Sequence, residues 1–153
     1  MKKAQAAMEF LMTYGWAILV VLAAIGALAY FGVLSPSKLL PSKCTLSPGF
    51  NFGDCKASAT GFQMTLYNGL GVDVKDVNVT IVSKAGSDVS CSDSQLITEN
   101  PLGNGATTGT ISFASCNGTV GQRFDADISI IYTKSGEQLS HTTTGVIQVK
   151  VEQ

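Results

Sequence analysis

Four cysteines are the residues of this chain whose chemistry is easiest to assign. Cys44, Cys55, Cys91 and Cys116 are separated by 11, 36 and 25 residues. These intervals lack the short paired spacing of a zinc site, and only one histidine is present as a further ligand. We therefore expect two disulfides rather than a metal site, which places this part of the chain in an oxidising environment.

Four cysteines allow three pairings, and the sequence alone does not choose among them. We favour Cys44 with Cys55, which closes a short loop, and Cys91 with Cys116, which joins the two sides of a segment rich in glycine and serine. Each bridge would stabilise a small exported domain by about 2 to 4 kcal/mol, because it restricts the unfolded chain.

Other residues that are able to do chemistry are sparse. His141 is the only histidine and lies in a polar, threonine-rich segment, where a solvated side chain is expected. Asp125 and Asp127 alternate along a predicted strand and most simply form its solvent face, although paired acids also serve catalysis or bind calcium. The sequence contains no nucleophile elbow or phosphate loop. We expect neither enzymatic activity nor a cofactor.

Two tripeptides fit the acceptor pattern for N-linked glycans. Asn78-Val79-Thr80 is predicted on the outer face of a strand, and Asn117-Gly118-Thr119 in a turn beside Cys116. Both are expected at the surface, where an exported chain can carry a glycan.

A long apolar segment near the N-terminus predicts on which side of a membrane these residues lie. Residues 10 to 34 carry no charge, and a bilayer is crossed by roughly 20 helical residues. Lys2 and Lys3 precede the segment, which favours a cytoplasmic N-terminus and an extracellular C-terminal domain. Glu9 is the one acidic residue directly before this segment.

Three interpretations of this N-terminus compete. A secretory signal could be cut after Ala27-Leu28-Ala29, but its apolar core would be unusually long. An uncut anchor fits the length but leaves Glu9 without a partner. Cleavage between Ala4 and Gln5 would create a new α-amine four residues before Glu9, close enough to neutralise the acid within one helix or from a neighbouring helix.

The third interpretation agrees with a family resemblance. Residues 2 to 17, KKAQAAMEFLMTYGWA, closely resemble the class III leader and first helix of archaeal type IV pilins. The resemblance covers about the first 35 residues and implies that a prepilin peptidase removes residues 1–4 as a leader, with Ala4 and Gln5 flanking the cut and Glu9 as the acid of the motif. It also implies a membrane platform protein and an assembly ATPase as partners. Archaellins share this kind of leader.

The apolar helix, residues 5–35, also has features suited to self-assembly. Small residues recur along it, among them Gly15, Ala23 and Ala27, and the last two form a small-xxx-small pair that permits close helix packing. Alanine and glycine are also simply frequent in membrane helices. If the amine of Gln5 pairs with Glu9 of an adjacent subunit, the contact runs head to tail and produces an open helical polymer.

The rest of the chain, residues 36–153, predicts an all-β domain. Pro36, Pro41 and Pro48 end helical continuation. Alternating apolar residues predict strands at residues 62–67, 72–81, 124–133 and 146–151, with a turn or bulge at residues 75–76. The expected fold class is α+β: a long apolar N-terminal helix followed by an immunoglobulin-like sandwich, least regular at residues 84–120.

These features predict a structural subunit of an archaeal type IV pilus, a cell-surface homopolymer that serves adhesion. After the expected cut, eight basic residues face eleven acidic ones, so the mature chain is mildly acidic and has no basic patch for nucleic acid. Three alternatives stay open. They are a minor pilin or substrate-binding pseudopilin, a membrane-anchored β-domain that binds a ligand without polymerising, and an archaellin.

Overall fold

The structure of the chain falls into two units. The computed structural model describes residues 2–31 and 41–153, with side chains in the helix from residue 6 onward. The N-terminal unit contains a single helix, and the C-terminal unit, Pro41–Gln153, contains all the strands that the structure describes.

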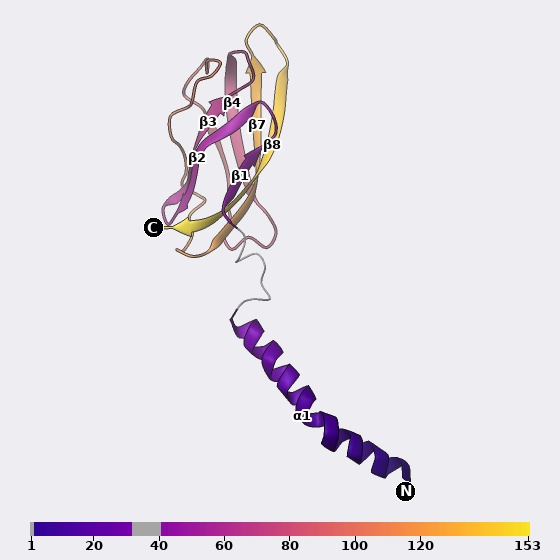
Figure 1. The fold of residues 1–153 in the computed structure, drawn as a ribbon. Coiled ribbons are helices and arrows are strands. Elements are labelled where there is room, and N and C mark those ends of the chain that lie inside the picture. Colours follow the sequence, from indigo (N-terminus) through magenta and orange to yellow (C-terminus); the bar gives the residue numbers. More distant parts are fainter. Residues whose placement is uncertain (1, 32–40) are drawn as a thin grey trace. The chain divides into compact units, whose positions relative to one another are not determined.

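Helix α1 spans Lys2–Tyr30 and is 29 residues long. It contains many alanines and leucines and no proline, a composition that favours a continuous helix. It begins three residues before the predicted start, because Lys and Ala of the leader are also good helix formers. The predicted end at residue 35 lies outside the described residues. The helix bends in its N-terminal half (Figure 1). In that half the Thr13 hydroxyl donates a hydrogen bond to the Glu9 carbonyl oxygen at 2.8 Å, a bond that often bends helices.

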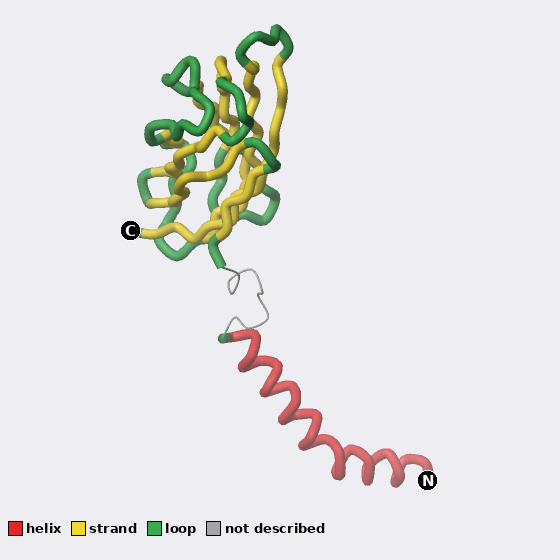
Figure 2. Tube along the Cα trace, turned by 45° about the horizontal axis from the view of Figure 1, so that its top comes forward, coloured by secondary structure: helices red, strands yellow, loops and turns green. Residues whose placement is uncertain are grey.

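The C-terminal unit is built from eight strands (Figure 2). In chain order they are β1 Lys43–Leu46, β2 Phe50–Ser58, β3 Gly61–Asn68, β4 Val74–Ser83, β5 Ser92–Leu96, β6 Ile111–Phe113, β7 Arg123–Lys134 and β8 Ser140–Glu152.

The strands form two layers that share β8. One layer has the order β5-β4-β7-β8-β1, and all its neighbouring strands are antiparallel. The other layer has the order β2-β3-β6, and the end of β8 joins it through a short parallel pairing with β2. The predicted class, α+β with a long apolar N-terminal helix followed by an all-β sandwich, is confirmed.

The core between the two layers is formed by the residues of each strand that point inward. Phe62 of β3 packs against Phe113 of β6 and Phe124 of β7, with ring centroids 6.3 and 5.5 Å apart. All three are fully buried. A buried aromatic cluster of this kind contributes area burial and favourable ring contacts together. The core therefore ties the second layer to the first across the full thickness of the sandwich.

The strands with clear alternation overlap the predicted ranges, but β4 is shifted by two residues to Val74–Ser83 and β8 begins at Ser140, six residues before the predicted start. In β3, Phe62, Met64 and Leu66 are buried, whereas Gln63 and Tyr67 are exposed. In β4 the pairing with β7 shifts between residues 75 and 78, as predicted, and Asp76 takes a φ of 56°. Strands β1, β2, β5 and β6 were not predicted.

Candidate functional site: the apolar helix and the sandwich surface

Helix α1 presents apolar side chains on every side. Residues Ala6–Tyr30 form a stretch long and apolar enough to cross a membrane. Within residues 8 to 30, fourteen large apolar side chains are between 46% and 87% exposed in the described chain. Leaving one such side chain in water forgoes roughly 1.5 to 3 kcal/mol of burial energy. The helix therefore needs a surrounding other than water, either lipid or other protein.

The one charged residue of this stretch lies near its start. Glu9 is exposed on the helix, and every residue after it up to Phe31 is uncharged. The backbones of Ala4 and Gln5 belong to α1, while their side chains lie outside the described ones. The backbone positions of residues 5 and 9 are about one turn apart in one continuous helix. The predicted neutralisation of Glu9 by a cleaved N-terminus stays a prediction.

The three predicted packing residues do not share one face. Ala23 and Ala27 lie one turn apart on the same side of α1, as a small-xxx-small pair requires. Gly15 lies about 80° around the axis from Ala23, because successive residues are about 100° apart. No atom outside the helix backbone lies within 4 Å of the position that a Gly15 Cβ would occupy, among the described residues. Of the three residues, only Ala23 and Ala27 therefore lie on one side of α1, where they form a strip of two small side chains.

Both expected disulfides are present. Cys44 of β1 is bonded to Cys55 of β2, with Cα atoms 6.7 Å apart. Cys91, just before β5, is bonded to Cys116, just after β6, with Cα atoms 4.6 Å apart. Cys91 and Cys116 are buried in the core. The first bridge joins β1 of the β8 layer to β2 of the other layer. The second joins the residue before β5 of the β8 layer to the segment after β6 of the other layer, so both bridges hold the two layers together.

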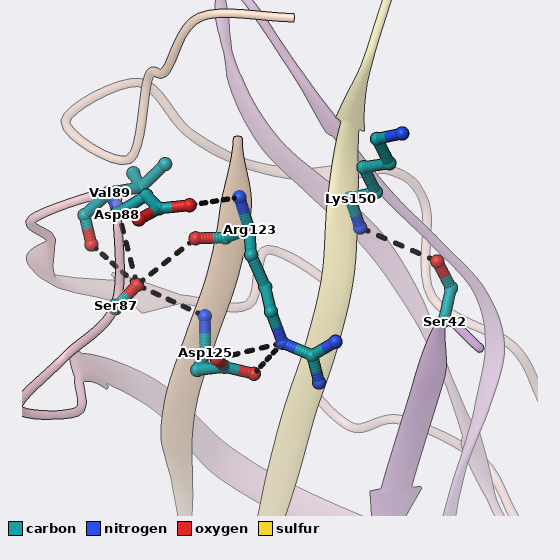
Figure 3. Close-up of polar contacts among 7 residues, drawn as sticks. All are labelled: Ser42, Ser87, Asp88, Val89, Arg123, Asp125 and Lys150. Atoms are coloured by element: carbon teal, nitrogen blue, oxygen red, sulfur yellow. Dashed lines mark hydrogen bonds and ion pairs between the residues drawn. The ribbon is translucent and has the colours of Figure 1, made fainter. Parts of the chain in front are cut away.

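The two aspartates of β7 each have their own cation. The Arg123 guanidinium Nε donates to both carboxylate oxygens of Asp125, at 3.0 and 2.9 Å (Figure 3). Asp127, two residues further along the same outer face, lies 3.0 Å from the Lys84 ammonium. The expected solvent face is therefore an ion-paired face. The carboxylates lie side by side on the strand, but each is neutralised separately.

The loop before β5 is fastened to the start of β7 next to this ion pair. The Ser87 hydroxyl accepts a hydrogen bond from the Asp125 backbone N–H at 3.1 Å and donates one to the Val89 carbonyl at 2.9 Å (Figure 3). The Asp88 carboxylate accepts from the Arg123 backbone N–H at 2.9 Å. On the far side of β8, the Ser42 hydroxyl accepts from the Lys150 backbone N–H at 3.4 Å (Figure 3). These polar contacts hold the loop before β5 against β7, and the residue before β1 against β8.

His141 lies at the start of β8, near the tip of the β7–β8 hairpin. Its ring is 5.6 Å from the Tyr132 ring and stacked on it, and its Nε2 lies 2.6 Å from the Glu137 carboxylate. The hydrogen bond to His141 and the nearby Lys134 charge lower the pKa of Glu137. The histidine is half-exposed and hydrogen-bonded rather than simply solvated.

The two glycosylation candidates have different surroundings. Asn78 lies within β4 between β5 and β7, and its side-chain oxygen accepts a hydrogen bond from the Ser94 hydroxyl at 2.8 Å. Its side chain is half-buried on the outer face, as predicted. Asn117 is exposed in the segment between β6 and β7, just after the turn that precedes Cys116. Asn117 is therefore the more accessible acceptor.

A shallow cleft of about 470 Å³ opens on the outer face of the β8 layer. Its walls combine hydroxyl groups from four strands or strand ends with the apolar side chains of Leu46, Val82, Ile128 and Val146, which make the exposed lining mostly apolar. The lining residues include Thr45, Ser47, Thr80, Val82, Ser129, Thr144 and Val146. The one carboxylate there, Asp127, is already paired with Lys84.

Three buried polar residues, Asn68, Thr108 and Thr143, were not indicated by the sequence, and Asn68 is the most deeply buried of them. It is fully buried at the end of β3, and its amide nitrogen donates to the carbonyls of Val72, Leu102 and Gly103 at 2.9, 3.2 and 3.1 Å. Its oxygen accepts from the Leu70 N–H at 3.1 Å. The Asn-Gly dipeptide marked only a turn in the sequence, and nothing local indicated the partners from residues 102 and 103.

No protein-family model matches this chain, and no curated protein matches it at a significant level. Its function is therefore inferred from its own residues and geometry.

Proposed function

We propose that this chain is a structural subunit of an archaeal type IV pilus, trimmed before Gln5 and polymerised through α1. The observation that carries the proposal is an apolar helix exposed on every face and preceded by the leader-like residues 2 to 9. Before assembly the helix lies in the membrane, and after assembly it lies among the helices of other subunits. The β-domain faces the surroundings and serves adhesion.

The exchange of lipid for protein around α1 explains which residues matter. Lipid tails are as apolar as leucine side chains. Moving the helix from lipid into contact with other protein helices therefore gains little free energy from the release of water. The gain comes from close packing, for which the strip at Ala23 and Ala27 is suited. Glu9 determines how adjacent helices are positioned along the filament axis, because a carboxylate in apolar surroundings requires a cationic or hydrogen-bonding partner. The new amine of Gln5 on an adjacent subunit supplies that partner.

The β-domain has features suited to an exposed coat. Two disulfides restrict its unfolded state, and its outer face carries paired charges and hydroxyl groups. Glycans at Asn78 and Asn117 would add to this coat. Homopolymers of such subunits need no cofactor.

The decisive experiment examines the first residue of the protein in sheared surface appendages. We expect electron microscopy to show filaments and mass spectrometry to show that their main subunit begins at Gln5. A product that begins after Ala29, or one that retains Met1, would overturn the proposal. A low copy number relative to another subunit would instead identify a minor pilin.

Variants at Glu9 test the assembly step separately from export. Glu9→Lys and Glu9→Gln are expected to accumulate in the membrane, with disulfides formed, and to yield no filaments. Glu152→Gln, which removes an exposed acid from the end of β8, is the matched control and is expected to assemble normally. Abundant normal filaments from Glu9→Lys would contradict the pairing of Glu9 with an N-terminal amine.

A further inference from the structure

Three Asn-Gly dipeptides occur in this chain, at residues 68–69, 104–105 and 117–118. Glycine after asparagine leaves the next backbone nitrogen sterically open, so that nitrogen can attack the asparagine side-chain carbonyl. The attack requires that the glycine N–H be free of a hydrogen bond and that the asparagine side chain be able to rotate. The three sites differ in both respects.

The first two sites are held by hydrogen bonds. At Asn68 the side chain is fully buried and bonded, and the Gly69 N–H donates to the Gly49 carbonyl at 2.8 Å. At Asn104 the side chain is exposed, but the Gly105 N–H donates to the Asn68 carbonyl at 2.8 Å. Each nitrogen must lose a hydrogen bond before it can attack.

The third site has neither restraint. Asn117 is exposed, and among the described residues no acceptor is bonded to the Gly118 N–H and no partner to the Asn117 side chain. The chain is fixed on both sides of the dipeptide, by the Cys116 disulfide and by the bond from the Thr119 N–H to the Gln122 side chain at 2.7 Å. The loop therefore keeps its neighbours in place while leaving this one peptide unbonded.

We propose that Asn117 is a site of spontaneous modification by deamidation, an inference that does not depend on the proposed function. The Gly118 nitrogen forms a bond to the Asn117 Cγ, the Cγ–Nδ2 bond breaks, and ammonia leaves with the proton from the Gly118 N–H. Water then opens the resulting succinimide. Attack at Cγ gives aspartate, and attack at the backbone carbonyl carbon gives isoaspartate. No oxidant or reductant is needed.

This chemistry competes with the glycan predicted at the same side chain. Deamidation converts Asn117 to an acid and so removes the acceptor pattern. A glycan on Nδ2 occupies the leaving nitrogen and protects the residue. Glycosylation and deamidation of Asn117 therefore exclude one another, and each unglycosylated chain gains a negative charge at this loop with age.

The test follows all three sites in one sample. The full-length protein is made in a bacterial host without N-glycosylation, its two disulfides are verified, and it is held in detergent at mildly alkaline pH. Peptide mapping then counts aspartate and isoaspartate at residues 68, 104 and 117. We expect Asn117 to react about tenfold faster than the other two, since one lost hydrogen bond changes a rate by about that factor.

Two comparisons make the outcome decisive. In the reduced and denatured chain the three sites should react at similar rates, because the dipeptide is the same. In the folded Asn117→Gln variant, the acidic form of the intact protein should no longer accumulate at the original rate. Equal rates at Asn104 and Asn117 in the folded protein, or an unchanged rate of acidification in Asn117→Gln, would overturn the inference.

Discussion

Asn68 shows how one side chain organises two loops of the sandwich. It is buried at the end of β3 and bridges the turn at residues 70 to 72 to the segment at residues 102 and 103. The Leu102 and Gly103 carbonyls have second donors in the Val74 and Ala106 N–H groups, whereas the Val72 carbonyl and the Leu70 N–H have no other hydrogen-bond partner among the described residues. The latter two groups depend on Asn68.

We therefore expect Asn68→Ala to destabilise the protein by about 2 to 4 kcal/mol, since two buried or half-buried backbone groups lose their partners at about 1 to 3 kcal/mol each. Chemical denaturation of the protein in detergent measures the change. Asn104→Ala is the matched control, because the Asn104 side chain is exposed and makes no hydrogen bond to the other described residues. It should change the free energy of unfolding by less than about 0.5 kcal/mol. Equal effects of the two variants would contradict this role.

The ionisation of Asp93 makes the stability of the folded protein depend on pH. The Ser115 hydroxyl donates to its carboxylate at 2.7 Å and is the main cause that lowers the pKa of Asp93 below its ordinary value of 3.8. A lowered folded-state pKa stabilises the protein above pH 3.8, and that stabilisation is lost as the pH falls through the lower folded value. The effect is small because solvent screens the carboxylate.

Ser115→Ala should accordingly cost about 0.5 kcal/mol near neutral pH, and the gap from the unmodified protein should narrow below pH 3.8. Unfolding curves recorded across this pH range measure the gap. Ser90 is exposed and its side chain makes no hydrogen bond to the other described residues, so Ser90→Ala should show no gap from the unmodified protein at any pH. A gap that widens on acidification would show that the Asp93 pKa is not lowered.

At the scale of elements, β1 depends on a glycine in its neighbour. β1 pairs with β8, and Leu46 lies opposite Gly145. A Cβ on Gly145 would lie 2.7 Å from the Leu46 Cδ2 and 3.0 Å from its Cα, and closer still to the Thr45 carbonyl oxygen. Backbone atoms cannot rotate away as a side-chain end can, so an added methyl group displaces the strand.

Gly145→Ala is expected to destabilise the protein by about 1 to 3 kcal/mol, the usual cost of overpacking. Hydrogen exchange should show faster exchange at the β1 amides, while the Cys44–Cys55 bridge keeps the strand tethered. Gly103→Ala serves as the control, since the nearest atom to its Cβ position is 3.8 Å away. Unchanged protection of β1 in Gly145→Ala would refute the packing argument.

The elements that could be predicted from the sequence are those that bury one complete face. Strands β3, β4, β7 and β8 alternate buried with less buried residues over six or more successive positions, and this is what their sequences display. β5, SDSQL, is polar throughout, and β6 has only three residues. In β2 the register shifts between Phe52 and Asp54, which interrupts the alternation.

The same distinction applies to the contacts at the surface. The Arg123–Asp125 ion pair joins residues on one face of a single strand, so alternation alone is enough to place it. The Lys84–Asp127 and Ser115–Asp93 contacts join residues that only the completed sandwich brings together. Sequence periodicity carries no information about such partners, because it describes one strand at a time.

At the scale of the whole molecule, the two units have opposite requirements for solvent. The β-domain buries its apolar residues within itself, whereas α1 leaves its own exposed. The buried residues that form the core of the described chain all belong to the C-terminal unit, and a helix as long and apolar as α1 requires lipid or other protein around it. A substitution in α1 should thus affect assembly without affecting the stability of the β-domain.

Matched leucine substitutions on opposite faces of α1 test this separation. Ala27→Leu enlarges the strip formed with Ala23 and should greatly reduce filament yield, because close helix approach requires small side chains. Ala29→Leu adds the same side chain about 160° around the axis and should be tolerated. Both variants should insert into the membrane, with both disulfides formed, since each makes the span more apolar. Filament yield after shearing measures assembly, and equal yields from the two variants would show that the alanine strip is not the packing face.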